Sequence, residues 1–124
     1  MGMRPVLVVY GLKTCDTCRK ARKWLDAQGI AHKFHDLCAD GIAAADIAYF
    51  AKAAGWKTLL NKASTTWRSL PESETEDAGE AEALKLMAAH PALIKRPVFD
   101  RGGGRVVVGF RDPQRAALKE ALSA

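Results

Sequence analysis

The sequence predicts an α/β fold with a mixed sheet, built in the order β-α-β, a helical segment, then β-β-α. Three observations lead to this prediction. A continuous apolar run at residues 5–10 is typical of a strand in a parallel or mixed sheet. An amphipathic helical pattern and a second strand follow within about thirty residues, as in a β-α-β unit. Near the other end, two strand-like runs flank R-G-G-G, which is a hairpin signal.

The β-α-β half is predicted from residues 5–36. The run P-V-L-V-V-Y is its first strand, which we expect to be buried on both faces. Residues 16–28 follow as a helix with one apolar and one basic face, and Gly29 ends it. The apolar face comprises Ala21, Trp24, Leu25 and Gln28, and the basic face comprises Arg19, Lys20, Arg22 and Lys23. Residues 30–36 form the second strand.

The middle of the chain is predicted to be helix and loop, without a strand. Residues 42–54 are alanine-rich with a helical apolar face; Asp40 is the expected cap and Gly55 ends the run. The acidic segment P-E-S-E-T-E-D is expected to form a loop and then to cap a helix at about 78–89.

The β-β-α half follows. Residues 97–100 and 105–110 are the two strands of the hairpin. Asp112 is expected to cap a last helix that begins at Pro113, because proline suits the first helical position. With no internal repeat and no disordered linker, we expect residues 1–124 to form a single domain with a helical insertion at about 41–92.

Composition narrows the function classes. The chain has 124 residues, of which 48% are hydrophobic and 27% charged, as in an ordinary globular domain. No apolar run approaches the ~20 residues that cross a bilayer, and no signal peptide is recognisable, so we expect a cytoplasmic protein without a membrane span. The net charge of +5 favours an anionic substrate or partner.

Two of the three cysteines form a Cys-x-x-Cys motif where the first strand meets the first helix. Backbone N–H groups at a helix start favour the thiolate of the first, Cys15, which makes it a candidate nucleophile. Cys18 lies one turn further and could close a disulfide with it. Asp16 opposes thiolate formation, whereas Arg19 favours it, so the sequence leaves the net shift of the pKa open.

Two other interpretations of the pair remain. Both cysteines could be small buried residues without chemistry, although Cys-x-x-Cys in a β-α-β context is an unusual coincidence. Alternatively, His32, His35 and Cys38 could complete a zinc site with the pair. Because the two histidines are three residues apart, they point to opposite faces of a regular strand, which argues against zinc. We expect no metal site, and Cys38 to lie in a loop.

Several segments together resemble one protein family. They are C-D-T-C-R-K-A-R-K-W-L, F-H-D-L-C-A-D-G, L-L-N-K-A-S-T-T-W-R-S-L, H-P-A-L-I-K-R-P-V and V-V-V-G-F. Over roughly residues 6–122 the chain resembles the ArsC-related proteins, which comprise glutaredoxin-coupled arsenate reductases, Spx-type transcription regulators and bacterial YffB-type proteins. T-T-W-R and F-H-D look closest to the YffB-type branch. The resemblance implies a thioredoxin-like fold with a cis Pro97 beside the active cysteine.

The resemblance also implies roles for individual residues. Cys15 matches the family's nucleophile, and Arg96 matches the arginine of its R-P motif. The arsenate reductases use two further arginines, but here Asn61 stands at one position and Arg111 is displaced from the other, which argues against efficient arsenate reduction. The residues expected to bind a substrate or glutathione are Lys13, Thr14, Arg19, Arg96, Pro97 and Arg111.

Two functions of different classes follow. The first is a thiol–disulfide oxidoreductase in which Cys15 attacks, Cys18 or glutathione resolves, and glutathione or a glutaredoxin-type reductant supplies electrons. Glutathione would be a co-substrate, and no bound cofactor is expected. The alternative is an Spx-like redox-responsive regulator that binds RNA polymerase. We expect a monomer that makes no direct contact with nucleic acid, because no DNA-binding motif is recognisable.

Overall fold

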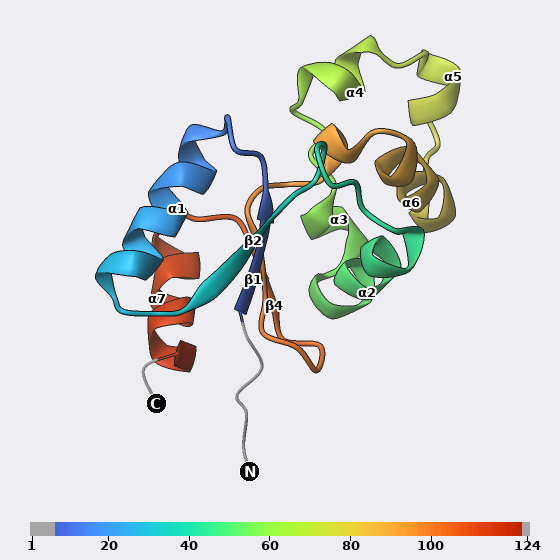
Figure 1. Ribbon diagram of the computed structural model, residues 1–124. Helices are drawn as coiled ribbons and strands as arrows, with labels where there is room; N and C mark the ends of the chain where they lie inside the picture. Colours follow the sequence, from blue (N-terminus) through green and yellow to red (C-terminus); the bar gives the residue numbers. More distant parts are fainter. Residues whose placement is uncertain (1–6, 123–124) are drawn as a thin grey trace. The chain divides into compact units, whose positions relative to one another are not determined.

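The computed structural model describes residues 7–122, which fold into two compact units. One unit comprises the described residues up to Asp36 together with those from Arg96 onward. The other comprises Leu37–Lys95. Figure 1 shows the first unit as a sheet with helices and the second as a group of helices.

The first unit is built on a four-stranded mixed sheet with the strand order β2-β1-β3-β4. The strands are β1 (Leu7–Gly11), β2 (His32–Asp36), β3 (Val98–Asp100) and β4 (Val106–Val108). β1 runs parallel to β2 and antiparallel to β3, and β3 runs antiparallel to β4. The predicted β-α-β unit, the hairpin and the mixed α/β sheet are therefore confirmed.

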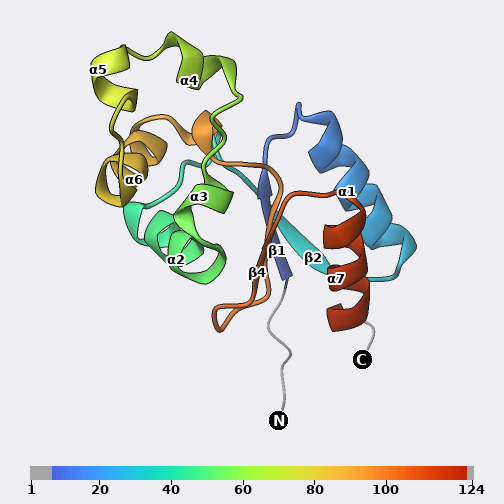
Figure 2. The ribbon, with the colours of Figure 1, turned by 180° about the vertical axis from the view of Figure 1, so that it is seen from behind.

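Two helices, α1 (Asp16–Ala27) and α7 (Asp112–Leu122), lie side by side on one face of this sheet (Figures 1 and 2). The core between them and the sheet consists of Leu7, Val9, Ala21, Leu25, Phe99 and Leu118. The prediction that β1 is buried on both faces was wrong, because burial alternates along the strand. Val8 and Tyr10, which point away from this core, are half-buried. Trp24 packs edge-on against Phe110, so it is a packing aromatic.

Glycine ends α1, as the sequence predicts. Gly29 has φ +70°, and its N–H donates to the Asp26 carbonyl while the N–H of Ile30 donates to the Leu25 carbonyl. This left-handed ending satisfies carbonyls of the last turn. Gln28, predicted on the apolar face, is exposed because it occupies the C-cap position, where the helix is already closing.

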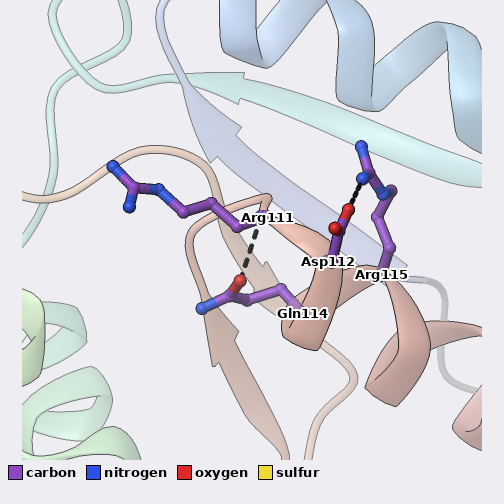
Figure 3. A network of polar contacts seen from close by, with 4 residues as sticks. All are labelled: Arg111, Asp112, Gln114 and Arg115. Carbon is purple, nitrogen blue, oxygen red and sulfur yellow. Dashed lines mark hydrogen bonds and ion pairs between the residues drawn. The ribbon is translucent and has the colours of Figure 1, made fainter.

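The start of α7 differs from the prediction, because Asp112 is its first helical residue and not its cap (Figure 3). Instead, the Gln114 side-chain oxygen accepts a hydrogen bond from the Arg111 backbone N–H at 3.0 Å. Asp112 forms an ion pair with Arg115 one turn on. The acidic side chain therefore supports the first turn through the helix dipole and this pair.

The second unit contains five α-helices and a short 3₁₀ helix within the described residues. They are α2 (Ala44–Ala54), α3 (Trp56–Leu59), α4 (Thr65–Ser69), α5 (Glu72–Thr75), α6 (Glu80–Ala89) and η1 (Pro91–Leu93). Between residues 7 and 122, no helix is long and apolar enough to cross a membrane.

Two predictions for this unit were wrong. Asp40 does not cap α2, because Asp40 lies in a turn, Gly41 follows with φ +74°, and Ala43 occupies the N-cap position. The acidic segment forms the short helix α5 rather than a loop, and α6 begins after Gly79 without a side-chain cap. The predicted helix end at Gly55 is confirmed, with φ +92°.

Candidate active site

The candidate site lies at one edge of the first unit's sheet. Gly11 at the end of β1 pairs with Asp36 at the end of β2. Because β3 runs antiparallel to β1, Pro97, which precedes β3, lies at the same edge. Residues 12–14 lead from this edge into α1, so they bring Cys15 to the end of the sheet.

Cys15 occupies the N-cap position of α1. Its backbone is extended (φ −83°, ψ 121°), and its carbonyl accepts the Arg19 N–H at 3.0 Å as the first helical hydrogen bond. The Cys15 N–H donates to the Leu12 carbonyl at 3.1 Å, which closes a turn before the helix. The thiol of Cys15 is half-buried, and neither this thiol nor the buried thiol of Cys18 is part of a disulfide. It therefore stands where backbone N–H groups favour an anion.

The surroundings of Cys15 lower the pKa of its thiol. Burial alone would raise this pKa, but the backbone N–H and the thiol of Cys18 and the guanidinium of Arg96 outweigh it. The Cys18 N–H faces the sulfur without making a regular capping hydrogen bond. Arg96 acts both as a hydrogen-bond donor and through its charge. A lower pKa means more thiolate, the nucleophilic form, at neutral pH.

Cys18 has the opposite character. It is fully buried in the first turn of α1, and burial is the main cause that raises the pKa of its thiol to about 11, with the neighbouring Cys15 adding to the effect. Its sulfur lies against Gly11, where an added Cβ would come within 2.4 Å of it. Cys18 is therefore a protonated thiol at neutral pH that faces Cys15 from inside the protein.

The Arg96–Pro97 peptide bond is cis, as the family resemblance implied. Pro97 is buried, and its carbonyl accepts the Gly109 N–H at 2.8 Å, which extends the β3–β4 pairing by one residue. Arg96 is half-buried, with its Nε enclosed by protein. The structure thus brings Arg96 to Cys15, while a catalytic role for it stays a prediction.

The other predicted binding residues are exposed. Lys13 and Thr14 belong to the loop before Cys15. Arg19 forms an ion pair with Asp16 on α1, so part of its charge is already matched. Arg111 stands before α7, and its side chain points away from the Asp112–Arg115 pair (Figure 3). Binding by these residues stays a prediction.

Sequence reasoning missed two residues that shape the site, Gly11 and Asp36. Gly11 leaves room for the Cys18 sulfur, and the buried Asp36 carboxylate accepts the Lys13 backbone N–H at 3.0 Å. In the sequence, Gly11 directly follows the predicted first strand, and Asp36 is the last residue of the predicted second strand. Their importance depends on contacts that sequence spacing does not reveal.

The two histidines considered as zinc ligands make other contacts. His32 Nδ1 lies 3.1 Å from the Ile30 carbonyl oxygen, and the His35 ring lies 5.1 Å from the Tyr10 ring. Cys38 is exposed in a loop of the second unit. Over residues 7–122, no group of three or more histidine, cysteine or acidic side chains is arranged to hold a metal ion.

Comparisons with known proteins agree on one family. The model of the ArsC family matches residues 10–118. The solved structure of a protein named YFFB is 46% identical, covers 90% of this chain and 97% of its own, and superposes with a TM-score of 0.84. An uncharacterized protein of Haemophilus influenzae is 40% identical over 90% of this chain and 97% of its own. The global transcriptional regulator Spx 2 of Lactococcus lactis is 23% identical over 91% and 86%. The fold is thioredoxin-like, as the family resemblance implied.

Proposed function

This chain belongs to the ArsC family, and on that premise we propose that it is a glutathione-dependent thiol–disulfide oxidoreductase with Cys15 as its nucleophile. The observation that carries the proposal is the position of the Cys15 sulfur. It lies at the start of α1, half-exposed, between the Cys18 N–H and the Arg96 guanidinium. A thiol held in this way is reactive at neutral pH, whereas a structural cysteine is buried and inert.

The proposed first step is attack of the Cys15 thiolate on one sulfur of a disulfide. A new bond forms between Cys15 and that sulfur, the substrate S–S bond breaks, and the second sulfur leaves as a thiolate that takes a proton from water. Arg96 stabilises the Cys15 anion before the attack. The product is a mixed disulfide on Cys15.

The mixed disulfide can be resolved in two ways. A glutathione thiolate can attack the substrate-derived sulfur and release Cys15, and the glutathione is oxidised in the same step. Alternatively, Cys18 attacks Cys15 and forms an internal disulfide, which two glutathione molecules then reduce. Because the pKa of Cys18 is about 11, its thiol must first lose a proton, so glutathione is the more direct resolving thiol.

Basic groups at the same edge suit glutathione, which carries two carboxylates. Arg96 is beside Cys15, and Lys13 and Arg111 lie exposed on the two loops that leave this edge. Thr14 directly precedes Cys15, and Pro97 precedes β3 at the same edge of the sheet. Arg19 contributes less, because it is paired with Asp16. Arsenate is not the main substrate in this proposal, because Asn61 stands at a sequence position where the family resemblance implies an arginine.

Two cysteine variants test the proposal with a glutathione mixed disulfide as substrate. Cys15→Ser should abolish glutathione-dependent reduction. Cys18→Ser, incubated with the substrate before reduced glutathione is added, should carry a mixed disulfide on Cys15 that mass spectrometry detects. Cys38→Ser is the matched control, because Cys38 is an exposed thiol in the other unit. Reduction that survives in Cys15→Ser would rule out the proposed mechanism.

The alternative function is a redox-responsive regulator similar to Spx. It is favoured by the similarity to Spx 2 over 91% of this chain and by the Cys15–Cys18 pair, which could act as a redox switch. Affinity capture of purified RNA polymerase by reduced and oxidised protein tests it. Absence of binding in both states would remove the alternative. In either case we propose a monomer that acts in the cytoplasm, with glutathione or a glutaredoxin-type protein as reductant.

A further inference from the structure

Asp36 is a buried acidic residue to which the proposed mechanism assigns no role. It is 6% exposed, and it is the one charged side chain buried in the described part of the chain. Burying a carboxylate is costly unless hydrogen bonds compensate. One of its oxygens, Oδ2, accepts the backbone N–H of Lys13 at 3.0 Å, across 23 residues of sequence.

This hydrogen bond lies where the sheet ends and the cysteine loop begins. The β1–β2 ladder ends with the pair Gly11 and Asp36. Beyond Gly11 the chain leaves the sheet, so the Lys13 N–H has no strand partner, and the Asp36 side chain takes that place. The next hydrogen bond along the chain joins the Cys15 N–H to the Leu12 carbonyl. The backbone from Gly11 to Cys15 is thus tied at both ends.

We propose that Asp36 is a positioning residue that holds the 12–14 loop so that the Cys15 sulfur stays opposite the Cys18 N–H and Arg96. The inference rests on the proposed role of Cys15 as nucleophile, and it assigns Asp36 no contact with the substrate. A charge-assisted bond to a backbone N–H is well suited to this task, because it is stronger than a neutral hydrogen bond and holds the loop backbone itself.

The charge of Asp36 is a separate matter from its hydrogen bond. A negative charge disfavours a nearby thiolate, but the main groups that shift the pKa of Cys15 are Cys18 and Arg96, so removing the Asp36 charge alone should change the reactivity of Cys15 little. Removing the hydrogen bond would make Cys15 less reactive, because the loop would no longer hold the sulfur against its donors. Two substitutions separate these effects. Asp36→Asn keeps an oxygen acceptor without the charge, and Asp36→Ala removes both.

The test is the rate of Cys15 alkylation by iodoacetamide as a function of pH, with the modified residue identified by mass spectrometry. Asp36→Ala should react about tenfold more slowly than the wild type at pH 7, with its pH profile displaced to higher pH. Asp36→Asn should recover most of the wild-type rate. Asp26→Ala is the matched control, because Asp26 is an exposed carboxylate of the same unit, and it should react like the wild type.

Any of three results would overturn the proposal. A folded Asp36→Ala protein could show the wild-type pH profile of Cys15 alkylation, Asp36→Asn could be alkylated as slowly as Asp36→Ala, or both variants could be alkylated faster than the wild type. If Asp36→Ala does not fold, amide hydrogen exchange of the wild type decides. The Lys13 N–H should then be protected well beyond its exposed neighbour Thr14, and equal exchange of the two would overturn the proposal. None of these readouts depends on turnover, so a missing glutathione-dependent activity would refute the proposed function alone.

Discussion

Replacing Gly11 with alanine is expected to destabilise the protein through Cys18. The new Cβ would lie 2.4 Å from the Cys18 sulfur, which is closer than real Cβ atoms approach, and 3.3 Å from the Cys18 Cβ, which is a tight contact. Cys18 is fully buried, so its sulfur cannot move aside into solvent. Overpacking of this kind costs about 1–3 kcal/mol, and the stiffer alanine backbone returns about 0.4–1 kcal/mol. The expected net loss in unfolding free energy is about 1–2 kcal/mol.

A double-mutant cycle isolates the contact. Urea unfolding of the wild type, Gly11→Ala, Cys18→Ala and the double variant can be followed by the fluorescence of Trp24 after Trp56 and Trp67 are replaced by phenylalanine. Because Cys18→Ala removes the sulfur that clashes, the double variant should be more stable than the sum of the single losses by about 1 kcal/mol. Additive losses, or a Gly11→Ala protein as stable as the wild type, would refute the reasoning.

Three further predictions concern the same unit. Arg96→Leu removes a hydrogen-bond donor and a charge that lower the pKa of Cys15, so alkylation of Cys15 at pH 7 should slow about tenfold. Arg96→Lys should keep part of the rate. An unchanged rate in Arg96→Leu would contradict the role given to Arg96. In a Cys15→Ser background, burial still raises the pKa of Cys18, although the contribution of Cys15 is gone. The unfolding free energy should therefore fall as pH rises from about 9 toward 11, by less than the ~3 kcal/mol that the full shift would give, and Cys18→Ala should remove this slope. Gln114→Ala removes the acceptor of the Arg111 N–H and should cost about 0.5–1.5 kcal/mol in thermal unfolding, whereas Gln114→Glu should not.

The order of elements in the first unit could be predicted because its signals are local and strong. Each of these signals determines the structure of only the few residues around it. They are the apolar run that forms β1, the glycine after α1 and the R-G-G-G turn. The cis peptide before Pro97 was also predicted, but from the family resemblance and not from local chemistry.

The errors arose where several residues competed for one structural position. Asp40 and Asp112 are both good capping residues, yet Ala43 and the Gln114 side chain take these tasks. Which residue stays extended before a helix depends on how the preceding loop packs, and composition does not report that packing. The same limit applies to Asp36, whose partner Lys13 is 23 residues away.

The direction of the Cys15 pKa shift was also beyond the sequence. Asp16 and Arg19, the charged neighbours in sequence, pair with each other on the surface of α1. The groups that lower the pKa are Cys18, one turn on, and Arg96, which is 81 positions away in the chain and reaches the site because β3 pairs with β1. Tertiary structure therefore decides the reactivity.

The central claim is that Cys15 is a nucleophile with a lowered pKa that reacts with glutathione disulfide. The most direct measurement is the rate of Cys15 alkylation between pH 4 and pH 10. It is made on untreated protein and on protein first incubated with oxidised glutathione, and peptide mass spectrometry identifies the product. We predict an apparent pKa clearly below the value of about 8.5 for free cysteine, and one glutathione on Cys15 that blocks alkylation. An apparent pKa at or above that value, or glutathione found on Cys38 and not on Cys15, would contradict it.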